Sequence, residues 1–391
     1  MRGVDGTPEC PEDVRELRDR VADFVRDRVF PCEPVLDAGG REAAAVLRRL
    51  QREAKDAGLW ALPLPTEIGG QGLPLSSYAH IAETEGASDH GPAALGSAAL
   101  LDVLMLWRHG SPHVREQYVG RLAAGEIRAC YAMTEPDTPG TDPFLTTTRA
   151  EPDETGTWHV TGCKWFTSGA ADADLVTVLA RTDGTPGDPE GLSLLLVPTR
   201  TTPGFRVVRE LPVLGATGQA EITLDDAAVG ADHVIGERGK ALDIAAERLQ
   251  LGLTLRCLRW IGQTRRAFDL MRERAATRTR SRGPIGDLQL VQQHVFESLL
   301  ALRTTRPLVY EAVARVDAGL DAHVEVGLAK VAAARTLQQV ADAAIQVHGA
   351  AGLVPDTALP ALFRTGRAAR ILDGPDELHV TSVAKRVLRA P

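Results

Sequence analysis

The chain has 391 residues, more than one hydrophobic core usually accommodates, so two or three structural parts are expected. Its composition is 44% hydrophobic and 25% charged with a formal net charge of -8, which is typical of a soluble protein and disfavours nucleic acid as a partner. The five cysteines form no CxxC pair, so neither a zinc site nor a disulfide framework is indicated, and a reducing cytoplasm fits.

No targeting or membrane segment is expected. The start of the chain carries a charged amphipathic pattern in place of a secretory signal. No apolar run reaches the roughly 20 residues of a membrane span. The sequence therefore predicts a cytoplasmic protein without a membrane span.

The first part of the chain has the apolar spacing of helices. Apolar residues recur at intervals of three and four at Val14, Leu17, Val21, Phe24, Val25 and Val29. Helical patterns continue to about Ile127, interrupted at residues 62–73 by LPLPTEIGGQGL, whose prolines and glycines predict a loop. We predict an N-terminal helical domain over residues 1–129.

The pattern then changes to short segments rich in β-branched residues and separated by Gly, Pro and Asp, which predicts a β domain over residues 130–236. From Lys240 onward the helical period returns in three long segments, which predict a helical bundle over residues 237–391. Strands and helices do not alternate, so a doubly wound nucleotide-binding sheet is disfavoured and the predicted class is α+β.

Several common catalytic motifs are missing from the sequence. The glycine clusters at residues 69–72 and 349–352 match no phosphate-binding motif, so turn formation is the preferred interpretation. The ten histidines include no HExxH, and no GxSxG is present, so a metal site and a serine nucleophile are disfavoured. The stretch YAMTEPDTPGTD at residues 131–142 is, on its pattern alone, best interpreted as a capped turn.

The stretch TGCKWFTSGA at residues 161–170 is more unusual. Two adjacent aromatic residues, Trp165 and Phe166, precede hydroxyl groups and a glycine in a chain with only 4% aromatic residues. Neighbouring side chains of a strand point to opposite faces, so these two rings are not expected to share a face. We expect one ring in the core and the other presented to a ligand.

These stretches, with QVHGAAGLVPDTALPALFRTGRAARILDGPDE near the end of the chain, resemble the acyl-CoA dehydrogenases over nearly the whole length. The segments MTEPD, KWFTSGA and DGPDE resemble more narrowly the branch called acyl-CoA dehydrogenase family members ten and eleven. The resemblance implies a helical domain, a β-barrel-like domain and a C-terminal four-helix bundle. It also implies FAD as cofactor and an α,β-desaturation of an acyl thioester.

The resemblance implies flavin contacts in the predicted β domain. Met133 and Thr134 offer main-chain or hydroxyl contacts to the flavin ring, and Thr141 approaches the pyrophosphate. Phe166 occupies the place where the family usually has a Trp against the ring, and Ser168 the place of a hydroxyl at the N5 edge.

Further contacts are implied across a subunit boundary. Arg282 and Gln293, in RGPIGDLQLVQQ, match positions that contact the FAD of the neighbouring subunit, with Ile285 in place of the usual Phe. The residues that match the QxxGGxG pattern, Gln346, Gly349 and Gly352, are implied to do the same. The resemblance therefore implies a homodimer or homotetramer.

The resemblance implies that Asp373 is the catalytic base, on a loop after a helical run that ends near Leu372, with Gly374 and Pro375 making a sharp exit. It takes an α-proton while the β-hydride passes to flavin N5. Asp is one methylene shorter than the usual Glu, so loop or substrate lies on the order of 1.5 Å closer, which leaves room for a branched acyl chain. Asp376 and Glu377 are both preferred as acidic residues that complement the dipole of the next helix at its first turn, with Glu377 as reserve base.

Leu253 stands where the family usually has an arginine near the base, and neither Arg248 nor Arg256 is at that register. This leaves coenzyme A or an acyl carrier protein open as the thioester carrier. The expected electron acceptor is a separate protein such as an electron-transfer flavoprotein. Two alternatives stay open, a flavin-dependent monooxygenase on the same scaffold and a catalytically silent relative. The acidic residue at 373 disfavours the first, and Arg282, Gln293 and Gln346 disfavour the second.

Overall fold

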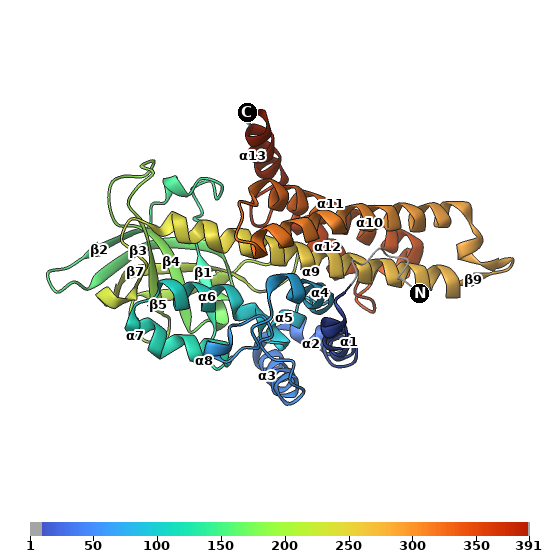
Figure 1. The fold of residues 1–391 in the computed structure, drawn as a ribbon, viewed down its shortest axis with the longest axis horizontal. Coiled ribbons are helices and arrows are strands. Elements are labelled where there is room, and N and C mark those ends of the chain that lie inside the picture. The colour runs from blue at the N-terminus through green and yellow to red at the C-terminus, as the bar shows by residue number, and fades with distance from the viewer. Residues whose placement is uncertain (1–9, 390–391) are drawn as a thin grey trace. The chain divides into compact units, whose positions relative to one another are not determined.

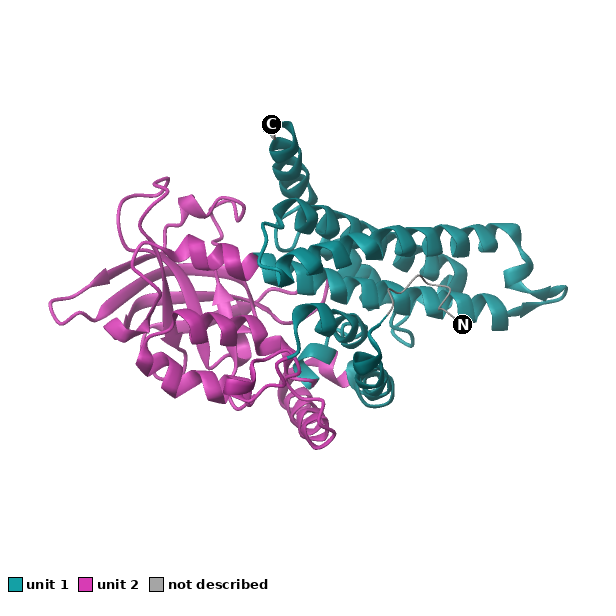
Figure 2. Ribbon diagram, in the orientation of Figure 1, with its two compact units in different colours: residues 1–34, 73–94, 250–391 teal, residues 35–72, 95–249 magenta. Residues whose placement is uncertain are grey.

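The structure is a computed structural model that describes residues 10–389. The chain divides into two compact units, coloured separately in Figure 2. Unit 1 comprises residues 1–34, 73–94 and 250–391, and unit 2 comprises residues 35–72 and 95–249. None of the helices between residues 10 and 389 is long and apolar enough to cross a membrane.

Over residues 10–389, unit 1 is helical apart from one short hairpin. The long helix α9 (Ala241–Thr277) belongs to it from residue 250 onward. The other elements of unit 1 are α1 (Glu12–Phe24), η1 (Val25–Val29), η2 (Phe30–Cys32), α4 (Leu75–Glu85), α5 (Gly91–Ala94), β9 (Thr279–Arg280), β10 (Gly283–Pro284), η9 (Ile285–Asp287), α10 (Gln289–Asp317), α11 (His323–His348), η10 (Gly349–Leu353), α12 (Leu359–Ala369) and α13 (Asp376–Arg389).

The core of unit 1 lies between four helices, as the resemblance implied. It contains Phe268 and Met271 of α9, Val340 of α11 and Leu362 of α12, and Val295 of α10 packs against it. Figure 1 shows α9, α10 and α11 running beside one another. The apolar stripe that the sequence showed at the start of the chain also faces inward, with five of its six residues buried and Leu17 half-buried.

Unit 2 combines a β-sheet with short helices. Its helical elements are α3 (Gly40–Asp56), η3 (Thr66–Ile68), η4 (Ser97–Ala99), α6 (Leu100–His109), α7 (Pro112–Val114), η5 (Arg115–Val119), α8 (Gly120–Ala123), η6 (Pro143–Leu145), η7 (Ala170–Asp172) and η8 (Ala231–His233), and α2 (Glu33–Ala38) enters it from unit 1. Its strands are β1 (Ala129–Ala132), β2 (Arg149–Pro152), β3 (Trp158–Ser168), β4 (Leu175–Arg181), β5 (Leu192–Pro198), β6 (Phe205–Glu210), β7 (Gln219–Val229) and β8 (Val234–Ile235).

The strands of unit 2 form one sheet in the order β6-β7-β3-β2-β4-β5-β8, and β1 pairs in parallel with β4. Strands β4 and β5 read as near-continuous apolar runs and are buried along almost their whole length. The helical, β and helical order of the chain confirms the α+β class expected from the sequence.

Candidate active site

The predicted cofactor residues fall into two groups. Met133, Thr134, Thr141, Phe166 and Ser168 lie in unit 2, and Arg282, Gln293, Gln346, Gly349 and Gly352 lie in unit 1 together with Asp373. Each group is described within its own unit.

In unit 2 the end of β1 meets the middle of β3. The Trp165 N–H donates to the carbonyl of Thr134 at 3.0 Å, and the Thr134 hydroxyl donates to the carbonyl of Trp165 at 2.8 Å. These two bonds bring the predicted Met133–Thr134 segment beside Phe166. They also commit the Thr134 hydroxyl proton to the main chain, which leaves main-chain groups and the oxygen lone pairs for a ligand.

The two aromatic residues of β3 lie on a β-bulge. The pairing of β3 with β7 shifts register between Lys164 and Thr167, and Phe166 has a positive φ of 49°. A bulge places an extra residue in one strand and redirects side chains, so strict alternation no longer applies. The ring centroids of Trp165 and Phe166 are 4.9 Å apart, with Trp165 half-buried and Phe166 43% exposed. The expectation that one ring packs in the core was wrong, because it assumed a regular strand.

A buried ion pair fixes the loop after β1. The Lys164 ammonium donates to Glu135 at 2.8 Å and to the carbonyl of Met133 at 2.9 Å. Glu135 also accepts the Thr147 N–H and hydroxyl and the Thr148 N–H. The residues 135–148 are therefore closed into a loop by one carboxylate.

The charges of this pair follow from these contacts. Burial by itself raises the pKa of Glu135, but the Lys164 charge and the hydrogen bonds outweigh it and lower the pKa to about 2. Burial lowers the pKa of Lys164 to about 8, against the pull of Glu135. Both groups are therefore charged near neutral pH.

The remaining residues of this group line the same segment. The Ser168 hydroxyl pairs with the Gln219 amide, at 2.8 Å from its nitrogen, and both side chains are accessible. Thr141 is exposed, and a Cβ on the preceding Gly140 would lie 2.9 Å from the Thr134 methyl. An exposed ring, exposed hydroxyls and a close main-chain turn fit the aromatic and phosphate parts of FAD.

In unit 1 Asp373 lies in a tight turn between two helices. Helix α12 ends at Ala369, earlier than the Leu372 expected from the sequence, and α13 begins at Asp376. Asp373 has a φ of 55° and Gly374 a φ of 93°, so two consecutive residues are in conformations that favour glycine. A Cβ at Gly374 would lie 2.9 Å from Leu378 Cδ2 and 3.0 Å from His379 Nε2.

The Asp373 carboxylate has a cationic partner on α9. The distance from Arg256 Nε to Asp373 Oδ2 is 3.1 Å, and both side chains are about one-third exposed. Arg256 follows Leu253 by almost one helical turn, so the same face of α9 carries a guanidinium close to the position where the sequence lacks one. The sequence placed Arg256 outside the register of the usual arginine, and the structure shows that its side chain nevertheless reaches Asp373.

Buried charges hold the main chain around Asp373. The Lys330 ammonium donates to the carbonyl of Gly374 at 2.7 Å and lies 3.5 Å from Asp376 Oδ1. His379 Nε2 lies 3.0 Å from the carbonyl of Asp373. Arg335 and Arg370 bind Asp376 Oδ2 at 3.1 and 2.9 Å. Asp376 begins α13, as expected from the sequence, but it is only 1% exposed and contacts three cations.

These contacts set the protonation of the cluster. Burial raises the pKa of Asp376 less than Arg370, Arg335 and Lys330 lower it, so the pKa lies below its ordinary value. Burial lowers the pKa of Lys330 and of His379.

The predicted unit 1 cofactor residues are mostly accessible. Arg282 is exposed between β9 and β10, and Gln293 is exposed on α10, where its amide donates to Glu297 at 2.7 Å. Gln346 is exposed in the last turn of α11, and Gly349 follows with a φ of 65°. Gly352 is buried, and a Cβ there would lie 2.9 Å from that of His348, so packing alone requires this glycine.

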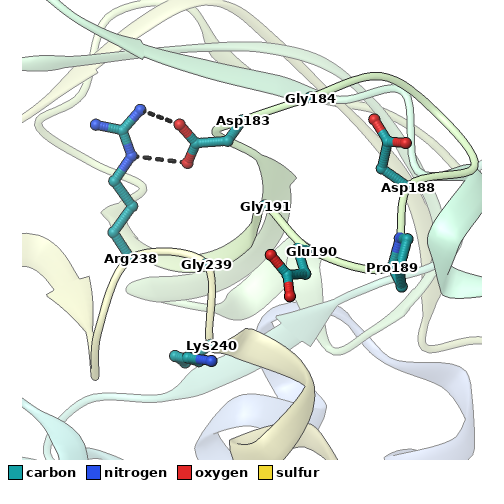
Figure 3. A pocket seen from close by; sticks show the side chains of 9 residues that line it. All are labelled: Asp183, Gly184, Asp188, Pro189, Glu190, Gly191, Arg238, Gly239 and Lys240. Carbon is teal, nitrogen blue, oxygen red and sulfur yellow. Dashed lines mark hydrogen bonds and ion pairs between the residues drawn. The ribbon is translucent and has the colours of Figure 1, made fainter.

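Unit 2 also contains a cavity of about 520 Å³ away from the predicted residues, shown in Figure 3. Its charged lining consists of three carboxylates and two cations, Asp183, Asp188, Glu190, Arg238 and Lys240. Arg238 is committed to Asp183 at 2.5 and 2.8 Å. The lining therefore has no surplus positive charge for a phosphate. Among residues 10–389 no cluster of His, Cys, Asp and Glu could hold a metal ion.

The fold and the predicted site residues together indicate a class of protein, and comparison with family models identifies that class. Residues 11–126, 130–227 and 239–388 match the N-terminal, middle and C-terminal domains of acyl-CoA dehydrogenase. The chain belongs to the acyl-CoA dehydrogenase family, a family of flavoprotein oxidoreductases. The FAD cofactor expected from the sequence is confirmed at the level of this family.

Comparison with individual proteins leads to the same family. The chain is 35% identical to the probable acyl-CoA dehydrogenase FadE2 of Mycobacterium tuberculosis over 95% of each chain. It is 31% identical to acyl-CoA dehydrogenase family member 10 of Mus musculus and to family member 11 of Homo sapiens, and spans 37% and 50% of their lengths. The narrower resemblance is thereby confirmed.

Solved structures share the whole fold. A structure assigned to an acyl-CoA dehydrogenase of Mycobacterium abscessus has a TM-score of 0.90 at 32% identity, covering 97% of this chain and 98% of that one. PigA with FAD and proline has a TM-score of 0.85 at 23% identity, covering 97% and 99%, and this likeness concerns the fold alone.

Proposed function

We propose that the protein is an FAD-dependent acyl-thioester dehydrogenase that desaturates its substrate between the α and β carbons, in the class EC 1.3. The observation that carries the proposal is the turn at Asp373, where a carboxylate is held at a φ of 55° and bound at one oxygen by Arg256. A strained residue is retained where the surrounding structure fixes it, which is common at active sites.

The protein's own groups perform the proton transfer in this proposal. Arg256 binds Oδ2 of Asp373, so Oδ1 is the oxygen that takes the α-proton of the thioester. The bound FAD would supply the hydride acceptor, which is chemistry that protein side chains do not provide. Phe166 would lie against the flavin ring, and Ser168, Met133, Thr134 and Thr141 would hold the cofactor.

We propose that the site is shared between two copies of the chain. Arg282, Gln293, Gln346 and Gly349 contact the FAD of a second subunit, in a homodimer or homotetramer, and their accessible side chains or main chain leave them available for this role. Gly352 supports the same segment by close packing. The domains 1–129, 130–236 and 237–391 act together in this arrangement.

The proposed partners are an acyl-CoA or acyl-carrier-protein thioester and a separate acceptor such as an electron-transfer flavoprotein, in the cytoplasm. Arg256 supplies positive charge near the reacting end of the ligand. A leucine at position 253, in place of the family's usual arginine, is therefore compatible with coenzyme A thioesters. Either carrier presents the same thioester to Asp373.

The test is an anaerobic titration of the FAD-loaded protein with straight-chain and branched acyl-CoA and acyl-carrier thioesters, monitored by flavin absorbance. We expect at least one thioester to bleach the flavin of the wild type and none to bleach that of Asp373→Ala, with FAD bound in both. If no thioester bleaches the wild-type flavin, the dehydrogenase assignment fails. Formation of a hydroxylated product with a reductase and O2 would then establish the monooxygenase alternative.

A further inference from the structure

We propose that Lys330 and Asp376 are positioning residues that hold the main chain of residues 373–376 in the conformation that presents the Asp373 carboxylate. The inference deepens the proposed function and rests on Asp373 being the base. Neither Lys330 nor Asp376 needs to touch the substrate in this role.

The first argument is the direction of the Lys330 contacts. Its ammonium is completely buried and donates to the carbonyl of Gly374, the residue directly after the base, at 2.7 Å. A buried ammonium without partners is very unfavourable, so its hydrogen-bond acceptors are strongly constrained in position. Gly374 has a φ of 93°, and this backbone conformation points its carbonyl at Lys330. Rotation of the peptide would move the carbonyl away and leave the ammonium without this acceptor.

The second argument is the role of Asp376 as counter-charge. Its carboxylate joins Lys330 of α11 at 3.5 Å, Arg335 of the same helix at 3.1 Å and Arg370 after α12 at 2.9 Å. The Asp376 N–H also donates to the carbonyl of Arg370 at 3.0 Å, which closes the turn around Asp373. One carboxylate therefore ties the end of α12, the start of α13 and the middle of α11 together around the base.

The ammonium of Lys330 interacts electrostatically with the carboxylates of Asp376 and Asp373 and with the Cys257 thiol of α9. Its direct main-chain contact is the hydrogen bond to the carbonyl of Gly374. A variant that keeps an N–H donor at position 330 should therefore rescue the rate that an apolar variant loses, a rescue that loss of packing alone would not require.

The experiment compares Lys330→Met, which removes the donor and the charge, with Lys330→Gln, which keeps an N–H donor without the charge. Both are loaded with FAD and mixed anaerobically with the thioester that bleaches the wild type. Lys385→Met, an exposed lysine of α13, is the matched control. Amide hydrogen exchange of the peptide covering residues 371–380 is measured on the same proteins without substrate.

We expect Lys330→Met to reduce the bleaching rate about 10-fold to 100-fold and to accelerate amide exchange in that peptide about 10-fold. Lys330→Gln should recover most of the rate, because it keeps an N–H donor for the carbonyl of Gly374. Lys385→Met should match the wild type. If Lys330→Met does not fold, Arg335→Gln carries the test, because it removes one partner of Asp376. Faster amide exchange in the same peptide would support the proposal, and unchanged exchange would overturn it.

The proposal is overturned if Lys330→Met bleaches at the wild-type rate with unchanged amide exchange. This outcome differs from failure of the proposed function, in which the wild-type flavin itself is not bleached. In that case the exchange measurement still decides whether Lys330 holds the turn. Unchanged exchange with a slower rate would also overturn the positioning role.

Discussion

At the scale of single residues, the proposed site contains the ion pair between Arg256 and Asp373. Matching the sequence to the family pattern did not locate this pair. Arg256 and Asp373 are each about one-third exposed, and such pairs contribute about 0 to 1 kcal/mol to stability. Any large effect of removing Arg256 should therefore appear in function and not in folding. This separation makes the residue a sharp test of the proposed geometry.

We expect Arg256→Gln to lower the rate of flavin bleaching by about 10-fold or more, because Asp373 loses the contact that orients its carboxylate. The melting temperature should change by less than about 2 °C. Stopped-flow absorbance and thermal unfolding measure the two quantities. Arg272→Gln, an exposed arginine on the same helix that pairs with Asp269, is the control. A normal rate in Arg256→Gln would remove this arginine from the mechanism.

A second residue-scale prediction concerns the glycine after the base. Gly374→Ala should destabilise the protein by more than the about 1 to 2 kcal/mol of a left-handed alanine, because its Cβ also collides with Leu378 and His379. Gly215→Ala is the matched control, since its φ of 88° is similar and nothing lies within 4 Å of a Cβ there. Chemical unfolding compares them. Equal losses in the two variants would mean that backbone strain, and not the collision, dominates.

At the scale of elements, the Glu135–Lys164 pair connects the loop after β1 with β3. The pKa of Glu135 is about 2 in the folded chain, below its ordinary value of 4.5, so its contribution is complete above pH 4.5. This contribution, on the order of 3 kcal/mol, is lost as the pH falls toward 2. We expect the free energy of unfolding to decrease over this range.

Glu135→Gln should reduce stability at pH 7 by about 3 to 5 kcal/mol, because buried Lys164 loses its counter-charge, and should flatten the pH dependence between 4.5 and 2. Urea unfolding at several pH values measures both effects. Glu154→Gln, in an exposed turn of the same sheet, should leave the curve unchanged. Parallel curves for wild type and Glu135→Gln would exclude this carboxylate as the source of the acid sensitivity.

At the scale of the whole molecule, α10 carries large apolar side chains that the chain itself leaves accessible. Leu290 is 74%, Phe296 65% and Leu300 51% exposed, on the helix that also carries Gln293. Exposed apolar patches commonly mark protein interfaces. A second copy of the chain is the expected occupant because the proposed FAD site needs residues from two subunits.

We expect Phe296→Glu to weaken the oligomer and to lower FAD occupancy with it. Sedimentation measures the mass and absorbance the bound flavin. Leu320→Glu, an exposed apolar residue outside the long helices, is the control. A monomeric wild type that holds FAD fully would contradict the shared site.

The order of helical and β parts was predictable because periodicities of 3.6 and 2 are local properties of the sequence. The bulge at Phe166 was not, since it depends on how β3 pairs with β7. The positions of Met133, Asp373 and Arg282 were proposed from motif resemblance, and their roles stay predictions. Arg256, Lys330 and Glu135 were missed because each meets its partner only after folding. Charged residues in otherwise apolar helix and strand faces, such as Lys330 and Lys164, were the available signal.

The cluster around Asp376 also has an evolutionary consequence. The Asp376 carboxylate balances the fully buried charge of Lys330, so it cannot be replaced alone without leaving that ammonium without its counter-charge inside the protein. Descendants of this chain that lose the acid at 376 should therefore have changed at 330 as well. Natural sequences related to this chain should therefore show covariation between position 330 and the Asp-Gly-Pro-Asp segment.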